Sequence, residues 1–355
     1  MGSLRLVLAL SVLLHHCSYH QIGIRLIDDG VAVQLFFMIS GFYIALILNE
    51  KYIAQGSIKR FYYNRFLRLF PVYWSVLVGA IGICVIYYVT AGNWRLLHSL
   101  STYAESMTLE TFVYVIFSNI AIFNQDLFFF MEYDLVEGAL HFSKGYDRTG
   151  TLPHKFLLIP QAWSISIELF FYAAAPFIVR HKKRIVVVFM MGIASRLIVI
   201  YGLGYDNGPW EYRFAPSEMS LFMMGAFSYH YMRYSFKLNL HVHTCLIISF
   251  AILYPNLPES EMIKWILFFV VASYLPSLFL ASKYSKVDRT IGDLSYPVYL
   301  VHSIVLSVML TIHGNTNSRA WLGLSVSVLS VFISFLILKF ISNPIEKIRN
   351  PLVKR

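Results

Sequence analysis

Residues 4–19 read LRLVLALSVLLHHCSY, an apolar run with Arg5 near its start and His16 near its end. Eleven residues make almost three turns of an α-helix, so the two side chains share one face, roughly 16 Å apart along the axis. Such groups are costly in an apolar helix unless they face a cavity or a partner. The run therefore predicts a membrane helix that points Arg5 and His16 into a helical bundle, with His16 as a candidate catalytic base.

The whole chain has the composition of a polytopic membrane protein. Of its 355 residues, 57% are hydrophobic and 14% are charged, whereas soluble domains carry about 25% charged residues. Apolar segments of roughly membrane-spanning length recur throughout. The eleven candidates are 4–19, 31–49, 71–90, 111–131, 161–179, 185–203, 217–234, 244–256, 264–281, 291–312 and 320–341.

The connecting segments predict the topology through the positive-inside rule. Lys and Arg gather in 50–70, 180–184, 282–289 and the C-terminal tail, which we assign to the cytoplasm. The segments 20–30, 132–160 and 255–263 are acidic or poor in bases, and we assign them to the outside. The net charge of +10 then reflects topology, and no nucleic-acid partner is expected.

Three candidate segments lie between the cytoplasmic segments 50–70 and 180–184. An odd number of crossings cannot return the chain to the same side of the membrane, so one of the three does not span. We choose 111–131, whose second half is polar; irregular backbone at membrane depth is tolerated where protein or water surrounds it. The predicted fold is all-α, a polytopic membrane protein with about ten transmembrane helices and both termini cytoplasmic. Residues 1–342 form the transmembrane domain, and 343–355 form a cytoplasmic basic tail.

Basic and aromatic residues mark the cytoplasmic entrance of the third segment. Arg65 and Arg68 are i,i+3 neighbours on one helix face just before Pro71. Arginines interleaved with aromatic rings suit phosphates and an adenine ring, although a plain positive-inside flank explains a single Arg equally well. We therefore name Arg65 and Arg68 as candidate cofactor-binding residues.

Further polar residues interrupt three other apolar segments. Ser40 and Gly41 permit close helix approach and are first of all a packing motif. Glu168, in the run Trp163-Ser-Ile-Ser-Ile-Glu168, has Tyr172 one turn later, and a membrane carboxylate needs a partner or a function. An ion pair with an Arg is as good an interpretation of Glu168 as a catalytic role.

The run Ser295-Tyr-Pro-Val-Tyr299-Leu-Val-His302 places Tyr299 and His302 on one face at i,i+3. A lone buried His is more often structural than catalytic. His15 is about 80° away from the face of Arg5 and is left out of the site. The three cysteines lack metal-like spacing, so neither a disulfide framework nor a metal site is expected.

In this order and at these intervals, the motifs resemble acyltransferase family 3, membrane enzymes that O-acylate bacterial envelope and extracellular glycans. The resemblance covers nearly the whole chain. It implies catalytic roles for His16, Arg5 and Glu168, with Ser40, Trp163, Tyr172, Tyr299 and His302 as substrate-binding or structural residues. It also implies that no cofactor is resident, and that acyl-CoA, with acetyl-CoA expected, is the co-substrate.

The resemblance further implies a multi-pass protein of the bacterial cytoplasmic (inner) membrane. Its expected partners are acyl-CoA, a glycan acceptor, the lipid bilayer and polysaccharide-assembly proteins. Direct transfer and an acyl-histidine intermediate both remain open. The alternatives are a glycan or lipid transporter or flippase without transfer chemistry, a membrane O-acyltransferase of the other, unrelated fold, and a structural partner in polysaccharide assembly.

Overall fold

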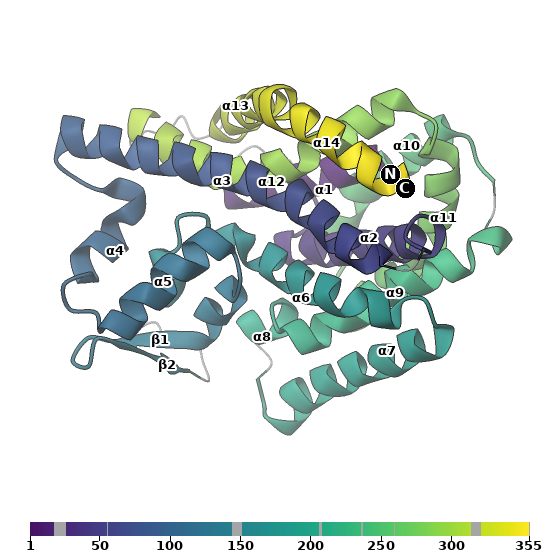
Figure 1. The fold of residues 1–355 in the computed structure, drawn as a ribbon, viewed down its shortest axis with the longest axis horizontal. Coiled ribbons are helices and arrows are strands. Elements are labelled where there is room, and N and C mark those ends of the chain that lie inside the picture. The colour runs from purple at the N-terminus through teal and green to yellow at the C-terminus, as the bar shows by residue number, and fades with distance from the viewer. Residues whose placement is uncertain are drawn as a thin grey trace.

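The computed structural model describes residues 1–17, 26–54, 56–143, 151–205, 208–235, 237–258, 260–313 and 321–354. Helices make up nearly all of this part of the chain, as predicted (Figure 1). Its sheet is one antiparallel hairpin, β1 (Met131–Asp134) with β2 (Ala139–Phe142). The helices are α1 (Gly2–His16), α2 (Asp29–Glu50), α3 (Ser57–Ala91), α4 (His98–Tyr103), α5 (Leu109–Ala121), α6 (Trp163–Ile178), α7 (Lys182–Leu197), α8 (Pro209–Tyr212), α9 (Ala215–His230), α10 (Leu240–Leu253), α11 (Glu261–Ser282), α12 (Lys286–His313), α13 (Leu322–Ile337) and α14 (Asn343–Lys354).

Six helices within the described ranges are long and apolar enough to cross a membrane. They are Asp29–Glu50, Ser57–Ala91, Lys182–Gly202, Glu261–Ser282, Lys286–Ile312 and Leu322–Arg349. Gly2–His16, Leu109–Ala121 and Leu240–Asn256 are shorter apolar helices. The chain therefore has the helices of a multi-pass membrane protein, while the total of ten spans and the cytoplasmic termini stay predictions.

Glycines bring the central helices into close contact. A Cβ atom on Gly41 of α2 would lie within 1.9 Å of the Phe222 carbonyl oxygen on α9. Likewise, a Cβ on Gly225 of α9 would lie 1.8 Å from the carbonyl oxygen of Met38. The predicted packing role of Gly41 is confirmed, because only a residue without a side chain permits this approach.

A buried ion pair fastens α7 to α9. Arg196 Nη2 lies 2.6 Å from Glu218 Oε1, and these side chains are 7% and 0% exposed. Gln34 of α2 adds its amide at 3.3 Å from each carboxylate oxygen of Glu218. Polar residues of three helices thus share one buried network.

Replacing Arg196 by Met is expected to destabilise the folded protein by roughly 3–5 kcal/mol, because Glu218 is left buried without its cation. The double replacement Arg196→Met with Glu218→Leu should recover most of that loss, since no unpaired charge then remains. Thermal unfolding in detergent measures both. Equal destabilisation of the single and double variants would contradict a predominantly electrostatic role.

The predicted segment 111–131 is not one continuous helix. Its helical part, α5, has 13 residues and ends at Ala121, after which Ile122 and Asn124 adopt positive φ. Thirteen residues rise only about 20 Å, less than the roughly 30 Å of a hydrocarbon core. Figure 1 shows α4, α5 and the hairpin gathered beside the end of α3.

This group of elements, which we call the cap (residues 92–160), has its own small core. Phe128, Tyr133 and Phe156 are buried in it. Asp126 is buried beside it and accepts a hydrogen bond from Ser166 Oγ at 2.7 Å, and burial raises the pKa of Asp126 to about 6. One of the polar residues in the second half of 111–131, Asp126, therefore joins the cap to α6.

The predicted basic tail is a helix. The π-helical turn Leu338–Ser342 continues α13 into α14, and α14 lies against α3. Figure 1 shows α14 passing over the first part of α3.

Candidate active site

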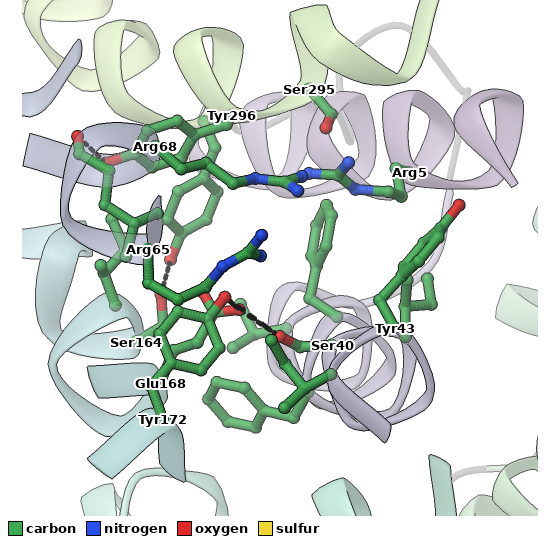
Figure 2. Close-up of a pocket in the computed structure, with 18 residues that line it drawn as sticks. Arg5, Ser40, Tyr43, Arg65, Arg68, Ser164, Glu168, Tyr172, Ser295 and Tyr296 are labelled. Carbon is green, nitrogen blue, oxygen red and sulfur yellow. Dashed lines mark hydrogen bonds between the residues drawn. The ribbon is translucent and has the colours of Figure 1, made fainter. Parts of the chain in front are cut away.

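Helices α1, α2, α3, α6 and α12 line an inner cavity (Figure 2). An adjoining outer cavity is lined by residues of α1, α2, α3, α11, α12 and α14. The inner cavity has a volume of about 90 Å³ and the outer one about 500 Å³. The two cavities share a wall, which is formed by Arg5, Tyr43, Arg65, Arg68 and Tyr296. The two cavities therefore adjoin at an arginine-rich wall.

Arginines dominate the shared wall. Figure 2 shows the guanidinium groups of Arg5 and Arg68 pointing toward each other, with Arg65 entering the same space. Arg65 is 8% exposed, and its Nη2 donates to Asn64 Oδ1 at 3.0 Å while its Nε has no partner. Like charges held together away from water favour an anionic ligand, and guanidinium groups match phosphate geometry.

Glu168 is the one carboxylate among the described residues lining the inner cavity. Its Oε1 accepts hydrogen bonds from Ser40 Oγ and, at 2.5 Å, from the hydroxyl of Tyr172. The Tyr172 ring also lies 6.0 Å from the Arg65 guanidinium carbon. The structure therefore groups the predicted residues Ser40, Glu168 and Tyr172 with the arginines.

His16 lies at the end of α1 and pairs with His302 of α12. His16 Nδ1 is 3.0 Å from His302 Nε2, and His302 Nδ1 is 2.8 Å from the backbone oxygen of Tyr299. A carbonyl oxygen only accepts, so His302 Nδ1 must carry a proton. His302 is fully buried, which favours its neutral ring and leaves Nε2 as an acceptor.

This chain of hydrogen bonds assigns the tautomer of His16. Because His302 Nε2 accepts, His16 Nδ1 must donate, and the lone pair of a neutral His16 is then on Nε2. That nitrogen lies 3.6 Å from Asp29 Oδ2, and the His16 side chain is 37% exposed. His16 therefore presents a proton-accepting nitrogen to accessible space, with a carboxylate placed to stabilise the imidazolium.

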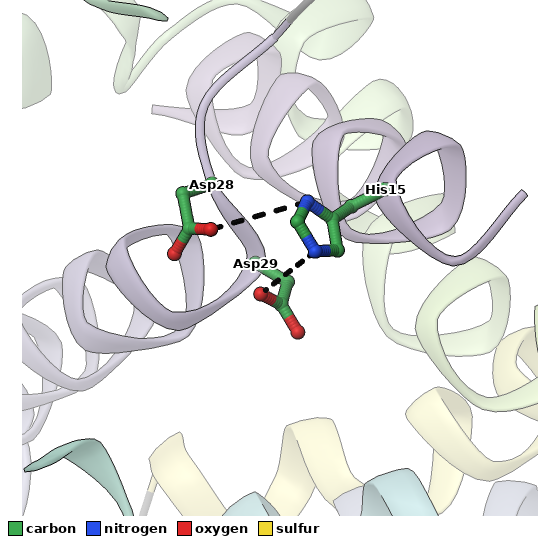
Figure 3. A group of neighbouring side chains, drawn as sticks. All are labelled: His15, Asp28 and Asp29. Carbon is green, nitrogen blue, oxygen red and sulfur yellow. Dashed lines mark ion pairs between the residues drawn. The ribbon is translucent and has the colours of Figure 1, made fainter. Parts of the chain in front are cut away.

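His15 and two aspartates surround this end of α1 (Figure 3). His15 Nε2 lies 3.5 Å from Asp29 Oδ1, and His15 Nδ1 lies 3.9 Å from Asp28 Oδ2. Asp28 also caps α2 by accepting the Gly30 N–H at 3.0 Å. The ligand atoms of these three residues lie within 4.8 Å of one another, a spacing at which they could hold a metal ion, although the ion pairs already account for their approach.

The remaining predicted residues have structural contacts. Tyr299 lines the inner cavity, donates to the Gln161 carbonyl oxygen at 2.8 Å and lies 2.8 Å from Ser164 Oγ. Trp163 is 4% exposed and packs edge-on against the Phe37 ring, with Arg213 5.0 Å from its own ring. Trp163 anchors the start of α6, while Tyr299 links the cavity to the His16–His302 pair.

The site thus combines an arginine-lined cavity with a histidine that has an available lone pair, and Tyr299 lies between them, lining the cavity and accepting from His302. A family model described as an acyltransferase domain matches residues 2–339 of the chain. The protein belongs to acyltransferase family 3. The predicted family is confirmed, and with its apolar helices this member is a membrane acyltransferase.

One relative of this acyltransferase is an uncharacterized protein of Aquifex aeolicus (strain VF5). The two are 25% identical over 231 residues, which is 58% of this chain and 96% of the relative. No solved structure matches the chain.

Sequence reasoning missed two contributors to the acyltransferase site. Asp29 was used only to assign a loop to the outside, although an acidic pair directly before an apolar helix also signals a helix N-cap. Asn64, beside Arg65, is 1% exposed and holds the guanidinium, yet a single Asn gives no sequence signal. Residues 18–25, which are the end of the predicted helix 4–19 and the start of the loop after it, lie outside the described ranges.

Replacing His302 by Leu is expected to lower kcat about 10- to 150-fold, because His16 loses the hydrogen-bond acceptor that orients its Nδ1 proton. The fold-change corresponds to roughly 1.5–3 kcal/mol, the contribution of a hydrogen bond to a group that becomes charged. His302→Gln keeps a carbonyl acceptor and should restore part of the rate. Steady-state kinetics with the donor varied should show little change in KM. Equal loss in both variants would show that His302 only fills space.

Proposed function

We propose that this acyltransferase moves an acyl group, expected to be acetyl, from acyl-CoA to a sugar hydroxyl of a cell-envelope or exported glycan, polymeric or lipid-linked. The arginine-lined cavity next to the His16–His302 pair is the observation that carries the proposal. We place the protein in the bacterial cytoplasmic membrane, with the donor entering from the basic, cytoplasmic side. Polysaccharide-assembly proteins are proposed partners.

In this proposal Arg5, Arg65 and Arg68 hold the phosphates of the donor. The pantetheine arm extends through the inner cavity toward His16, passing Tyr299, which lines that cavity and whose ring centroid is 5.9 Å from that of His302. Burial of the thioester away from water protects it from hydrolysis. Glu168, fixed by Ser40 and Tyr172, balances the arginine charge and faces the same space.

The chemical step uses His16 Nε2. This nitrogen accepts the proton of the sugar hydroxyl while the hydroxyl oxygen bonds to the thioester carbonyl carbon. The C–S bond then breaks, and the imidazolium returns the proton to the leaving thiolate, so that acyl-glycan and free CoA are formed. Asp29 stabilises the transient imidazolium.

An acyl-histidine intermediate remains the alternative to direct transfer, because the same lone pair can attack the thioester itself. Rapid quenching with radiolabelled acetyl-CoA in the absence of glycan distinguishes the routes. Label retained on the wild-type protein supports the intermediate, and unlabelled protein that still turns over supports direct transfer.

The proposal is tested with purified protein in detergent, acetyl-CoA and glycan from the parent cells. Release of free CoA together with a mass increase of one acetyl group on the glycan is the expected result. Glycan movement across liposomes without CoA release would instead establish the transporter reading. Longer acyl-CoA donors, assayed in parallel, measure acyl selectivity.

A further inference from the structure

One side of the outer cavity is formed by α14 and not by the predicted pair Arg65 and Arg68. Its lining includes Arg349 and Glu346 of α14, which lie beyond the residues matched by the family model. Seven Lys or Arg residues line this cavity against four Asp or Glu residues. One of the four, Asp288, is already engaged, because it accepts the backbone N–H groups of Gly2 and Ser3 at 2.7 and 2.9 Å.

A single amide holds Arg349 beside Arg65. Asn64 Oδ1 accepts from Arg65 Nη2 at 3.0 Å and from Arg349 Nη2 at 3.2 Å. Asn64 Nδ2 in turn lies 3.5 Å from the Arg349 backbone oxygen, so the contact joins α3 to α14. The Nε atoms of both arginines are buried and have no hydrogen-bond partner among the residues that the structure describes.

Two guanidinium groups on one neutral oxygen repel each other, and the shared amide engages only the Nη2 atom of each. A phosphate between them would use their other N–H donors and offset the repulsion. The same phosphate would bind α14 to α3 more firmly than Asn64 does alone.

We propose that α14 is part of the donor site, and that Arg349 and Arg65 together bind a phosphate of acyl-CoA, which clamps the C-terminal helix onto α3. This inference rests on the proposed use of acyl-CoA. In this proposal the basic C-terminal segment 343–355 binds the donor, in addition to marking the cytoplasmic side of the membrane.

Binding of CoA to the full-length protein in detergent, measured by calorimetry, tests this assignment without any need for turnover. Arg349→Gln should weaken CoA binding by about tenfold or more, the loss of a charge-assisted bond to phosphate. Lys347→Gln is the matched control, because Lys347 is an exposed base of the same helix outside the cavity lining. It should bind CoA within about twofold of the wild type, as surface charges contribute little.

Hydrogen exchange of the α14 backbone gives a second readout. Addition of CoA should slow exchange in α14 of the wild type and of Lys347→Gln, and should leave it unchanged in Arg349→Gln. Dephospho-CoA, which lacks the 3′-phosphate, identifies the phosphate: retained protection assigns the diphosphate, and lost protection assigns the 3′-phosphate.

Arg349→Gln could weaken CoA binding simply by detaching α14 from α3 in the unliganded protein, and a second variant distinguishes this effect from the loss of a phosphate contact. Asn64→Asp keeps an acceptor between the two arginines but neutralises them with a carboxylate. CoA binding should again fall about tenfold or more, while α14 stays protected from exchange without ligand.

The outcomes separate the inference from the proposed function. Wild-type affinity for CoA in both Arg349→Gln and Asn64→Asp would overturn the role of α14 and leave the acyl-CoA reaction standing. No binding of CoA by the wild type would overturn the donor itself, and with it this inference.

Discussion

Replacement of His16 by Gln lowers the rate of acyl transfer by roughly 10²–10⁴-fold in our expectation, the usual contribution of a positioned general base. Gln matches much of the length of the imidazole but cannot accept and return a proton. The loss should fall on kcat, because His16 is not among the residues that line the two cavities, whereas the arginines proposed to hold the donor are. Steady-state kinetics with purified protein measure it, and calorimetry checks that CoA still binds.

His15→Gln is the matched control for this variant. His15 is adjacent in sequence and approaches the same Asp29, but the contact with His302 belongs to His16. We expect the control to retain activity within a few fold. Full activity in His16→Gln, or equal loss in both variants, would remove His16 from the chemistry.

The second large effect concerns the donor. Arg68→Gln is expected to raise the KM for acyl-CoA by about 10- to 100-fold, because it removes one charge-assisted contact to phosphate worth roughly 1.5–3 kcal/mol. The KM for the glycan should change little, since the arginine faces the cavity shared with Arg5 and Arg65. Initial rates over a grid of donor and glycan concentrations separate the two constants.

Lys59→Gln is the control for this charge change. Lys59 lies on the same helix, is exposed and does not line either cavity. It tests whether basic residues act in general through the positive-inside surface or only within the cavity. Similar effects of Lys59→Gln and Arg68→Gln on donor KM would contradict a specific phosphate site.

The helical class and much of the site could be predicted from the apolar runs and the polar residues that interrupt them. Arg5, Arg65, Arg68 and Glu168 face one cavity because helical periodicity places each on the inward face of its own segment. The predicted place of Gly41 in a close helix crossing follows from the same kind of reasoning. These are properties of single helices, which local sequence determines.

Only the tertiary structure decided which of these faces meet. His16 and His302 are 286 residues apart, yet their hydrogen bond assigns the tautomer that leaves the lone pair of a neutral His16 on Nε2. Asn64 and Arg349 are likewise joined by the packing of α14 on α3, and Glu168 pairs with Ser40 and Tyr172 rather than with an arginine in direct contact. The sequence by itself determined the helical class, the inward faces of single helices and the family motifs, because periodicity and burial cost act within a segment. The partners of each polar group were decided by the tertiary structure, because they depend on how separate helices pack.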